Sequence, residues 1–191
     1  VCLRMNPDKE AHTHSQIVTG KAENKFGSAL QDMLEVVGLA EQLPNISFSG
    51  LHFHIGSQIT DMLDYVALCQ RINEIQDLLN QHGIYPSMIN VGGGLGVDYQ
   101  APDEHPIADF RAYFQVFEQQ LHLRSGQSLH FELGRSVVAQ CGSLITRVLY
   151  VKQAMTKQFV IVDAGMTELL RPALYQAKHT IQNLSAPSNT N

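Results

Sequence analysis

The chain has 191 residues, of which 44% are hydrophobic and 16% charged, with a formal net charge of -5. This composition is ordinary for a soluble globular protein with a buried core, and it excludes a disordered chain. The acidic balance without Lys/Arg clusters argues against nucleic acid as a partner, and no apolar run approaches the ~18 residues of a membrane span. The sequence therefore favours a cytoplasmic protein that binds a small molecule.

The first predicted elements are a strand and a helix. Residues from Val1 onward read as a strand, so we expect the chain to be a piece of a longer protein. Residues 28–43 predict a helix, because Ser28 and Gln31 have the spacing of a capping box and the apolar residues after them share one helical face.

A second strand and helix follow in the same order. The apolar run 50–55 is a strand candidate. A helix is predicted from about Met62 to His82, since Asp61 can cap its start, Gly83 can end it and its apolar residues lie on one face. A strand followed by an amphipathic helix is the repeating unit of an α/β fold.

Two further strands flank a third helix. Strands are predicted at 87–91 and 128–132, and an aromatic-rich amphipathic helix is predicted from Pro106 to Leu121 between them. Strands separated by helices of this length predict βαβ units and a parallel sheet.

The pattern changes after Glu132. The apolar segments 137–154 and 158–165 come without an intervening helix. We therefore expect a mostly antiparallel β region in the last part of the chain.

Three motifs stand where predicted strands end, and the working residues of parallel α/β folds gather at such ends. They are HFHIGSQ at 52–58, NVGGGLGVDY at 90–99 and HFELGRS at 130–136. The successive glycines Gly92, Gly93 and Gly94 exceed the needs of a tight turn and let an anion approach the backbone, so phosphate is the natural ligand. A turn that binds no ligand is the alternative.

Charged and aromatic residues of the same motifs narrow the choice of ligand. Arg135 beside Gly134 could meet the same phosphate, with a surface ion pair as the alternative. His52 and His54 share one strand face, which suits zinc or iron ligation, but a metal site explains neither the glycines nor the arginine. A cofactor with a phosphate, a flat ring and a ring nitrogen paired with Glu132 explains all three strand ends, and pyridoxal phosphate has these features.

These motifs, together with RMNPD, THSQIVTGKAENKFG and above all DAGMTELLRPALYQAKH at 163–179, resemble the diaminopimelate decarboxylases, which are alanine-racemase-like (fold type III) pyridoxal phosphate enzymes. The last motif is the most specific, because related ornithine and arginine decarboxylases share the glycine loop but not MTELLRPALY. The resemblance implies an α/β fold: the second half of a (β/α)8 TIM barrel in residues 1–140, followed by the start of a C-terminal β-domain in residues 141–191.

The resemblance also implies roles for individual residues. His54 would stack on the pyridine ring with Ser57 nearby, and Glu132 would pair with the ring nitrogen. The other residues that it places at the cofactor or substrate are Gly92, Gly93, Gly94 and Gly134 at the phosphate, Arg135 at cofactor and substrate, and Arg171 and Tyr175 at the substrate.

The chain departs from the family in two respects. Leu133 stands where the family usually has proline, and because this removes no hydrogen-bond donor, little functional loss is expected. No lysine of the chain stands in the family's Schiff-base motif, and the family's later cysteine is also absent. We therefore assign no catalytic residue and expect the chain to be inactive by itself.

The function implied for the parent protein is that of a homodimeric carboxy-lyase. It would use pyridoxal 5'-phosphate to convert meso-2,6-diaminopimelate to L-lysine and CO2 in lysine biosynthesis. Two alternatives remain open. One is a non-catalytic, pyridoxal-phosphate-binding pseudoenzyme, and the other is a metal-dependent TIM-barrel hydrolase that uses His52, His54, His130 and Asp163.

Overall fold

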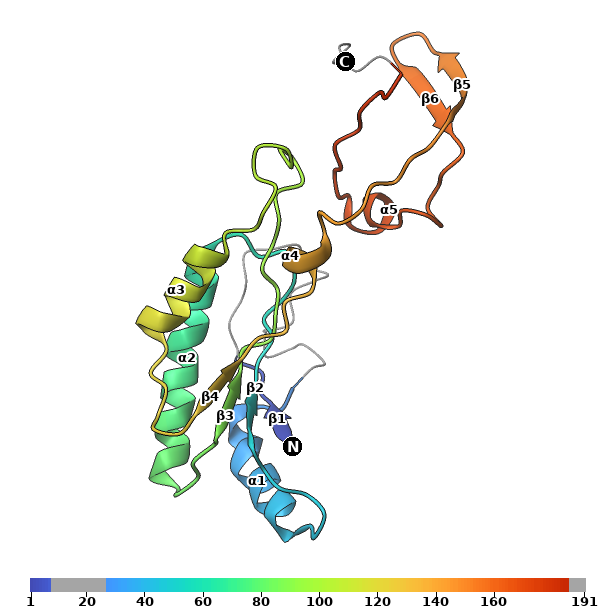
Figure 1. Ribbon diagram of the computed structural model, residues 1–191. Helices are drawn as coiled ribbons and strands as arrows, with labels where there is room; N and C mark the ends of the chain where they lie inside the picture. The colour runs from blue at the N-terminus through green and yellow to red at the C-terminus, as the bar shows by residue number, and fades with distance from the viewer. Residues whose placement is uncertain (8–26, 186–191) are drawn as a thin grey trace. The chain divides into compact units, whose positions relative to one another are not determined.

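Figure 1 shows the chain as a computed structural model, which describes residues 1–7 and 27–185. The motif THSQIVTGKAENKFG, apart from its final glycine, lies outside the described residues. The chain divides into two compact units, which we call the sheet unit and the hairpin unit. The sheet unit is Val1–Val97 with Ile107–Val138, and the hairpin unit is Asp98–Pro106 with Ala139–Asn191.

The sheet unit is built on four short parallel strands. They are β1 (Cys2–Arg4), β2 (Gly50–His52), β3 (Met88–Asn90) and β4 (Ser128–His130). The strands lie side by side in sequence order, β1-β2-β3-β4, and every neighbouring pair is parallel. This confirms the predicted parallel sheet of βαβ units, although each strand is shorter than its apolar run.

A helix or helical turn follows each of these strands. The helical segments are the 3-10 turn η1 (Leu30–Asp32), α1 (Met33–Gln42), α2 (Met62–Gln81), α3 (Phe110–Gln120) and the short α4 (Arg135–Val138). The prediction for α2 is confirmed to within one residue, and its cap is formed as expected, because Asp61 Oδ1 accepts a hydrogen bond of 2.9 Å from the backbone N–H of Leu63.

Two predicted helix starts are wrong. Ser28 does not cap a helix: its N–H donates to Arg4 O and its carbonyl accepts from Asn6 N, so its backbone pairs with the end of β1. Helix α3 starts at Phe110 rather than near Pro106, because Asp109 Oδ1 accepts from Ala112 N at 2.9 Å and caps it there. In both cases a tertiary or capping contact overrides the local pattern.

The α4 helix is a smaller departure from the sequence prediction. It occupies Arg135–Val138 and so overlaps the start of the segment 137–154, which we expected to belong to a mostly antiparallel β region. The turn is short because Gly134 O accepts from both Val137 N and Val138 N and only four residues take helical geometry.

The core of the sheet unit lies on one face of the sheet. Helices α2 and α3 run alongside each other there (Figure 1). Leu51, Phe53, Ile89 and Val91 are fully buried, and they pack in one cluster with buried residues of both helices. Burial of apolar surface on this face stabilises the unit by about 25 cal/mol per Å².

Helix α2 contributes a buried thiol to the same core. Cys69 is a free cysteine with no exposed surface. Burial raises the pKa of its thiol to about 12, so it stays protonated and behaves as a small apolar residue.

The hairpin unit contains an antiparallel pair of strands. Strands β5 (Val148–Gln153) and β6 (Gln158–Val162) pair antiparallel, and the unit also holds the one-turn helix α5 (Arg171–Tyr175). The expected antiparallel pairing in this part of the chain is therefore confirmed. Within residues 1–7 and 27–185, no helix has the length and apolar character needed to cross a membrane.

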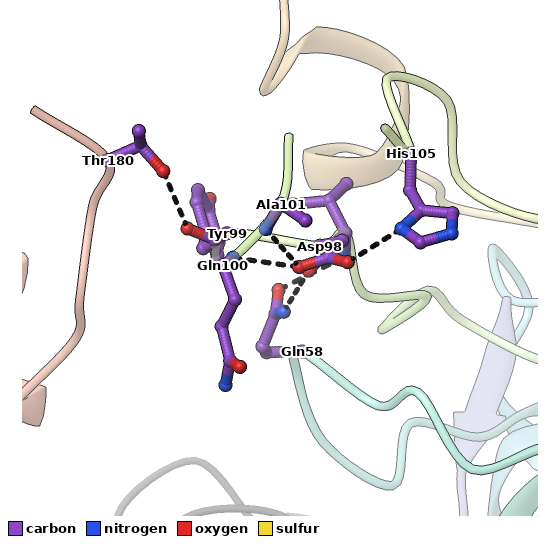
Figure 2. Close-up of polar contacts among 8 residues, drawn as sticks. Gln58, Asp98, Tyr99, Gln100, Ala101, His105 and Thr180 are labelled. Atoms are coloured by element: carbon purple, nitrogen blue, oxygen red, sulfur yellow. Dashed lines mark hydrogen bonds and ion pairs between the residues drawn. The ribbon is translucent and has the colours of Figure 1, made fainter. Parts of the chain in front are cut away.

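Residues 98–106 are tied to the rest of the hairpin unit by polar contacts. Figure 2 shows Asp98 accepting hydrogen bonds from the N–H groups of Gln100 and Ala101, with the His105 ring 3.0 Å from its other oxygen. In the same view Thr180 Oγ1 donates to the carbonyl of Tyr99. The carboxylate thus closes a local turn, and the threonine joins it to the C-terminal part of the unit.

Candidate functional site

The second face of the sheet carries polar side chains. The parallel register aligns Arg4, His52, Asn90 and His130 in one row across the four strands. Because successive side chains of a strand point to opposite faces, these residues lie opposite the buried row that contains Leu51. We define the polar face as the set Arg4, His52, His54, Asn90, His130 and Glu132.

The pairing of the backbones continues past the ends of the strands. Phe53 N donates to Asn90 O at 2.8 Å, and Glu132 N donates to Gly92 O at 2.7 Å. His54 and Glu132, each two residues beyond a strand, therefore stay on the polar face. The three motifs found at predicted strand ends meet at this edge of the sheet, except that the hairpin unit begins within the second motif, at Asp98.

Glu132 presents a carboxylate that has a neighbouring side chain at each oxygen. Its Oε1 accepts a hydrogen bond of 2.9 Å from Asn90 Nδ2, and its Oε2 lies 3.4 Å from His52 Nε2. The side chain of Glu132 is 55% exposed. A fixed and accessible carboxylate of this kind can accept a hydrogen bond from a protonated ring nitrogen.

Glycines are needed in this loop because the backbones that follow β2 and β4 pass close to it. Gly92 has φ +69°, and a Cβ on it would lie 2.3 Å from Phe53 O. A Cβ on Gly93 would lie 2.3 Å from Glu132 O. Because such contacts are shorter than atoms tolerate, both positions require glycine even without a ligand, a reason that the sequence pattern alone did not reveal.

The amide groups of this loop also have partners inside the chain. Gly92 N donates to Asn90 Oδ1 at 2.9 Å, and Gly93 N donates to His54 Nδ1 at 3.3 Å. The backbone amides of Gly92 and Gly93 therefore already have hydrogen-bond partners in the chain. The assignment of Gly92, Gly93 and Gly94 to a phosphate stays a prediction.

His54 is held as a neutral ring. Burial lowers its pKa, and the nearby charges of Arg4 and His52 lower it further, while Glu132 acts in the opposite direction. The contact of Nδ1 with the N–H of Gly93 also requires that this nitrogen carry no proton. A neutral, half-buried imidazole offers a flat face on which an aromatic ligand can stack.

The loop after β4 contains donors without partners. In the described part of the chain, the buried Nη1 of Arg135 and the buried Oγ of Ser136 have no hydrogen-bond partner. Gly134 precedes them, and a Cβ there would meet no atom within 4 Å. Buried donors are costly when unpaired, so the two side chains fit an anionic group bound beside this loop. Ser57, half-buried after β2, is the remaining predicted cofactor residue.

The predicted substrate residues Arg171 and Tyr175 are the two ends of α5 in the hairpin unit. The guanidinium of Arg171 lies 4.3 Å from the centroid of the Tyr99 ring, and its Nη1 lies 3.1 Å from His179 Nε2. The rings of Tyr99 and His179 meet edge to face. Arg171 is thus held in place by an aromatic face and an imidazole nitrogen.

The histidines and Asp163 of the alternative metal hypothesis do not form a metal site. No three His, Cys, Asp or Glu side chains among the residues that the structure describes are placed to share a metal ion. Asp163 belongs to the hairpin unit, where it accepts hydrogen bonds from Thr146 Oγ1 and Arg147 N. His130 contacts Ser128 Oγ at 3.0 Å.

Sequence reasoning missed four residues of these networks. They are Asn90, Ser136, Tyr99 and His179. The sequence did contain an indication for Asn90, because this residue lies two positions before Gly92 and so shares its strand face. Its contact with Glu132 depends on the register between β3 and β4, which one sequence does not specify.

Comparison with known proteins identifies relatives of the chain. Residues 1–139 match the family described as "Pyridoxal-dependent decarboxylase, pyridoxal binding domain". Diaminopimelate decarboxylase of Bacteroides thetaiotaomicron is 58% identical over 186 residues, which are 97% of this chain and 48% of that protein. The corresponding protein of Neisseria meningitidis serogroup B is 46% identical over 182 residues, 95% of this chain and 43% of that protein.

A solved structure is similar over the same extent. It is a variant of Helicobacter pylori diaminopimelate decarboxylase complexed with L-lysine, with a TM-score of 0.84 and 40% sequence identity. The similarity covers 95% of this chain and 44% of that one. The chain therefore spans less than half the length of these relatives.

Proposed function

The chain belongs to the family of pyridoxal-dependent decarboxylases, and on that premise we propose that the protein it forms converts meso-2,6-diaminopimelate to L-lysine and CO2. In this reaction the bond from one α-carbon to its carboxylate breaks, CO2 leaves and a proton takes its place. The observation that carries the proposal is the 58% identity, over 97% of the chain, to a protein named diaminopimelate decarboxylase. The lysine held by the similar Helicobacter pylori enzyme supports the choice of product.

The residues of the polar face fit the family's cofactor, pyridoxal 5'-phosphate. When bound, the cofactor supplies an electron-accepting ring that takes up the electron pair left when CO2 departs. Glu132 would hold the proton on the ring nitrogen, and His54 would lie against the ring. The unpaired donors of Arg135 and Ser136 would bind the phosphate together with Gly94 and Gly134.

For the substrate, we assign Arg171 and Tyr175 of the hairpin unit. A substrate with two carboxylates needs a cation that stays charged and keeps its orientation, and a guanidinium meets both needs. The contacts of Arg171 with Tyr99 and His179 support this role, since they fix the plane of the guanidinium.

The architecture that we propose is half of a (β/α)8 barrel in residues 1–140 and the opening of a β-domain in residues 141–191. Four consecutive parallel strands in sequence order are half of such a barrel, which takes about 250 residues when complete. The share of the relatives that the chain covers is consistent with this size. A homodimer located in the cytoplasm is part of the same proposal.

The test is a decarboxylation assay on the protein made from the complete reading frame that contains these 191 residues. We expect release of CO2 from meso-diaminopimelate, and much slower release from ornithine or arginine. Glu132→Ala should lower kcat at least about 100-fold, as expected for loss of an electrostatic contact in the transition state. Cofactor binding with no turnover of any of these amino acids would contradict the proposal and support the non-catalytic alternative.

A further inference from the structure

Asn90 joins the two ends of the candidate cofactor site with one side chain. Its Nδ2 donates to Glu132 Oε1 at 2.9 Å, and its Oδ1 accepts from Gly92 N at 2.9 Å. Both functional groups of the amide are therefore used, and only one orientation of the amide satisfies both bonds. One partner is the carboxylate assigned to the ring nitrogen, and the other opens the glycine loop assigned to the phosphate.

We propose that Asn90 is a positioning residue: it holds the Glu132 carboxylate in line with the ring nitrogen of the cofactor and fixes that carboxylate relative to the glycine loop. This inference rests on the proposed function. Asn90 itself touches neither the reacting atoms nor the substrate, and it acts through Glu132.

The surroundings of Glu132 explain why this contact matters. Among the residues that the structure describes, the amide of Asn90 is the single side chain that donates a hydrogen bond to the Glu132 carboxylate. His52 lies 3.4 Å from the other oxygen, but its Nε2 does not meet hydrogen-bond geometry there. A carboxylate with a 55% exposed side chain would otherwise rotate among several positions.

Neither an aspartate nor an apolar residue at position 90 satisfies both partners. An aspartate at position 90 would still accept from Gly92 N, but it would turn a second carboxylate toward Glu132. An apolar residue would leave the buried N–H of Gly92 without a partner. The amide of asparagine donates to the carboxylate through Nδ2 and accepts from the backbone amide through Oδ1 at the same time.

Asn90→Asp is the most informative variant, because it keeps the bond to the glycine loop and removes the bond to Glu132. The chain offers a matched control in Asn73 on α2. Asn73 Nδ2 donates to Gln120 O at 2.8 Å and its Oδ1 accepts from His122 N at 2.9 Å. Asn73→Asp therefore makes the same chemical change to an amide with the same pattern of bonds, away from the polar face.

The experiment measures binding of two probes to the cofactor-stripped protein from the complete reading frame, by isothermal titration calorimetry. The first probe is 4'-deoxypyridoxine 5'-phosphate, which lacks the aldehyde and so needs no lysine. The second is its analogue with C–H in place of the ring nitrogen. A role through Glu132 affects only the first probe, whereas a merely structural role affects both.

We expect Asn90→Asp to weaken binding of the pyridine probe about tenfold, the size of one hydrogen bond to a charged group. The C–H analogue should bind the variant and the unsubstituted protein equally, which also shows that the variant is folded. Asn73→Asp should change neither affinity. In a Glu132→Gln background, Asn90→Asp should no longer discriminate between the probes, because the carboxylate through which it acts is gone.

Three results would overturn the inference. They are equal affinity of Asn90→Asp and the unsubstituted protein for the pyridine probe, an equal loss with both probes, and the same loss in the Glu132→Gln background. If the unsubstituted protein binds neither probe, the proposed function fails along with the inference. Binding of both probes without discrimination by Asn90→Asp overturns the inference alone.

Discussion

The two faces of the four-stranded sheet carry residues of opposite character. On one face Leu51 and Ile89 have no exposed surface and pack against helices α2 and α3. On the other face their chain neighbours His52 and Asn90 are half-buried and lie beside the Glu132 carboxylate. Adjacent residues of a strand thus belong to different environments.

This difference separates stability from binding within the same strands. Apolar burial on the helix-facing side supplies the free energy that keeps the strands in register. That register then places polar groups of the other face within hydrogen-bond distance of one another. We expect substitutions on the first face to lower the free energy of unfolding, and substitutions on the second to change binding while the fold persists.

Leu51→Ala should show the largest effect. Removal of a fully buried leucine side chain should lower the free energy of unfolding by about 2–5 kcal/mol, because it loses apolar burial and leaves a cavity. His52→Ala, one residue away on the polar face, should cost less than about 1 kcal/mol. Urea denaturation of the two variants measures both values. Similar losses would contradict the claim that the helix-facing side, and not the polar face, supplies the stability.

Gly93→Ala and Gly134→Ala should differ in free energy of unfolding, by less than Leu51→Ala and His52→Ala differ. A Cβ on Gly93 would lie 2.3 Å from Glu132 O, so the two loops must move apart at a cost of about 1–3 kcal/mol. A Cβ on Gly134 would meet nothing within 4 Å, so the Gly134→Ala variant should be as stable as the unsubstituted protein. Thermal unfolding of both variants tests this, and a stable Gly93→Ala protein would show that the glycine is there only for a ligand.

His54 should make stability depend on pH. Because its pKa in the folded protein is lowered from 6.5, the unfolded state binds the proton more tightly. The stability it contributes is fully present above pH 6.5 and is lost as pH falls through the lower pKa of the folded state. His54→Gln should remove this part of the slope when the free energy of unfolding is measured from pH 8 downward. An unchanged slope in the variant would contradict the burial of a neutral ring.

Tyr113→Phe should have the smallest effect. The side chain of Tyr113, a residue of α3, is fully buried, and its hydroxyl has no hydrogen-bond partner within residues 1–7 and 27–185. Removing an unpaired buried hydroxyl should leave the free energy of unfolding unchanged or raise it by up to about 1 kcal/mol. A clear loss in urea denaturation would show that the helix-facing side also contains a polar contact that matters.

The sequence was sufficient for the order of the four parallel strands and for helices with their own local signals. Asp61 and the apolar face of Met62–Gln81 define α2 without help from the rest of the fold. Ser28 had an equally good local signal, yet its backbone pairs with β1. A contact between residues far apart in sequence cannot be read from the spacing of neighbours.

The sequence suggested residues for the candidate site, whose roles stay predictions, but it did not indicate their contacts. His54, Glu132 and Arg135 follow from motifs at strand ends, and the polar face holds the first two. The partners of these residues depend on strand register and on side-chain rotamers. This is why Asn90 was not recognised, and why the amides of the glycine run were expected to be free for a ligand although Asn90 Oδ1 accepts a hydrogen bond from Gly92 N.

The central claim is that one pyridoxal phosphate molecule bridges the polar face, with its ring nitrogen at Glu132 and its phosphate beside Gly94, Gly134 and Arg135. A crystal structure of the protein bound to 4'-deoxypyridoxine 5'-phosphate tests it most directly. We predict a distance of about 3 Å between the ring nitrogen and a Glu132 oxygen, with the phosphate against the loop after β4. A ring nitrogen facing away from Glu132, or a phosphate bound elsewhere on the molecule, would contradict the claim.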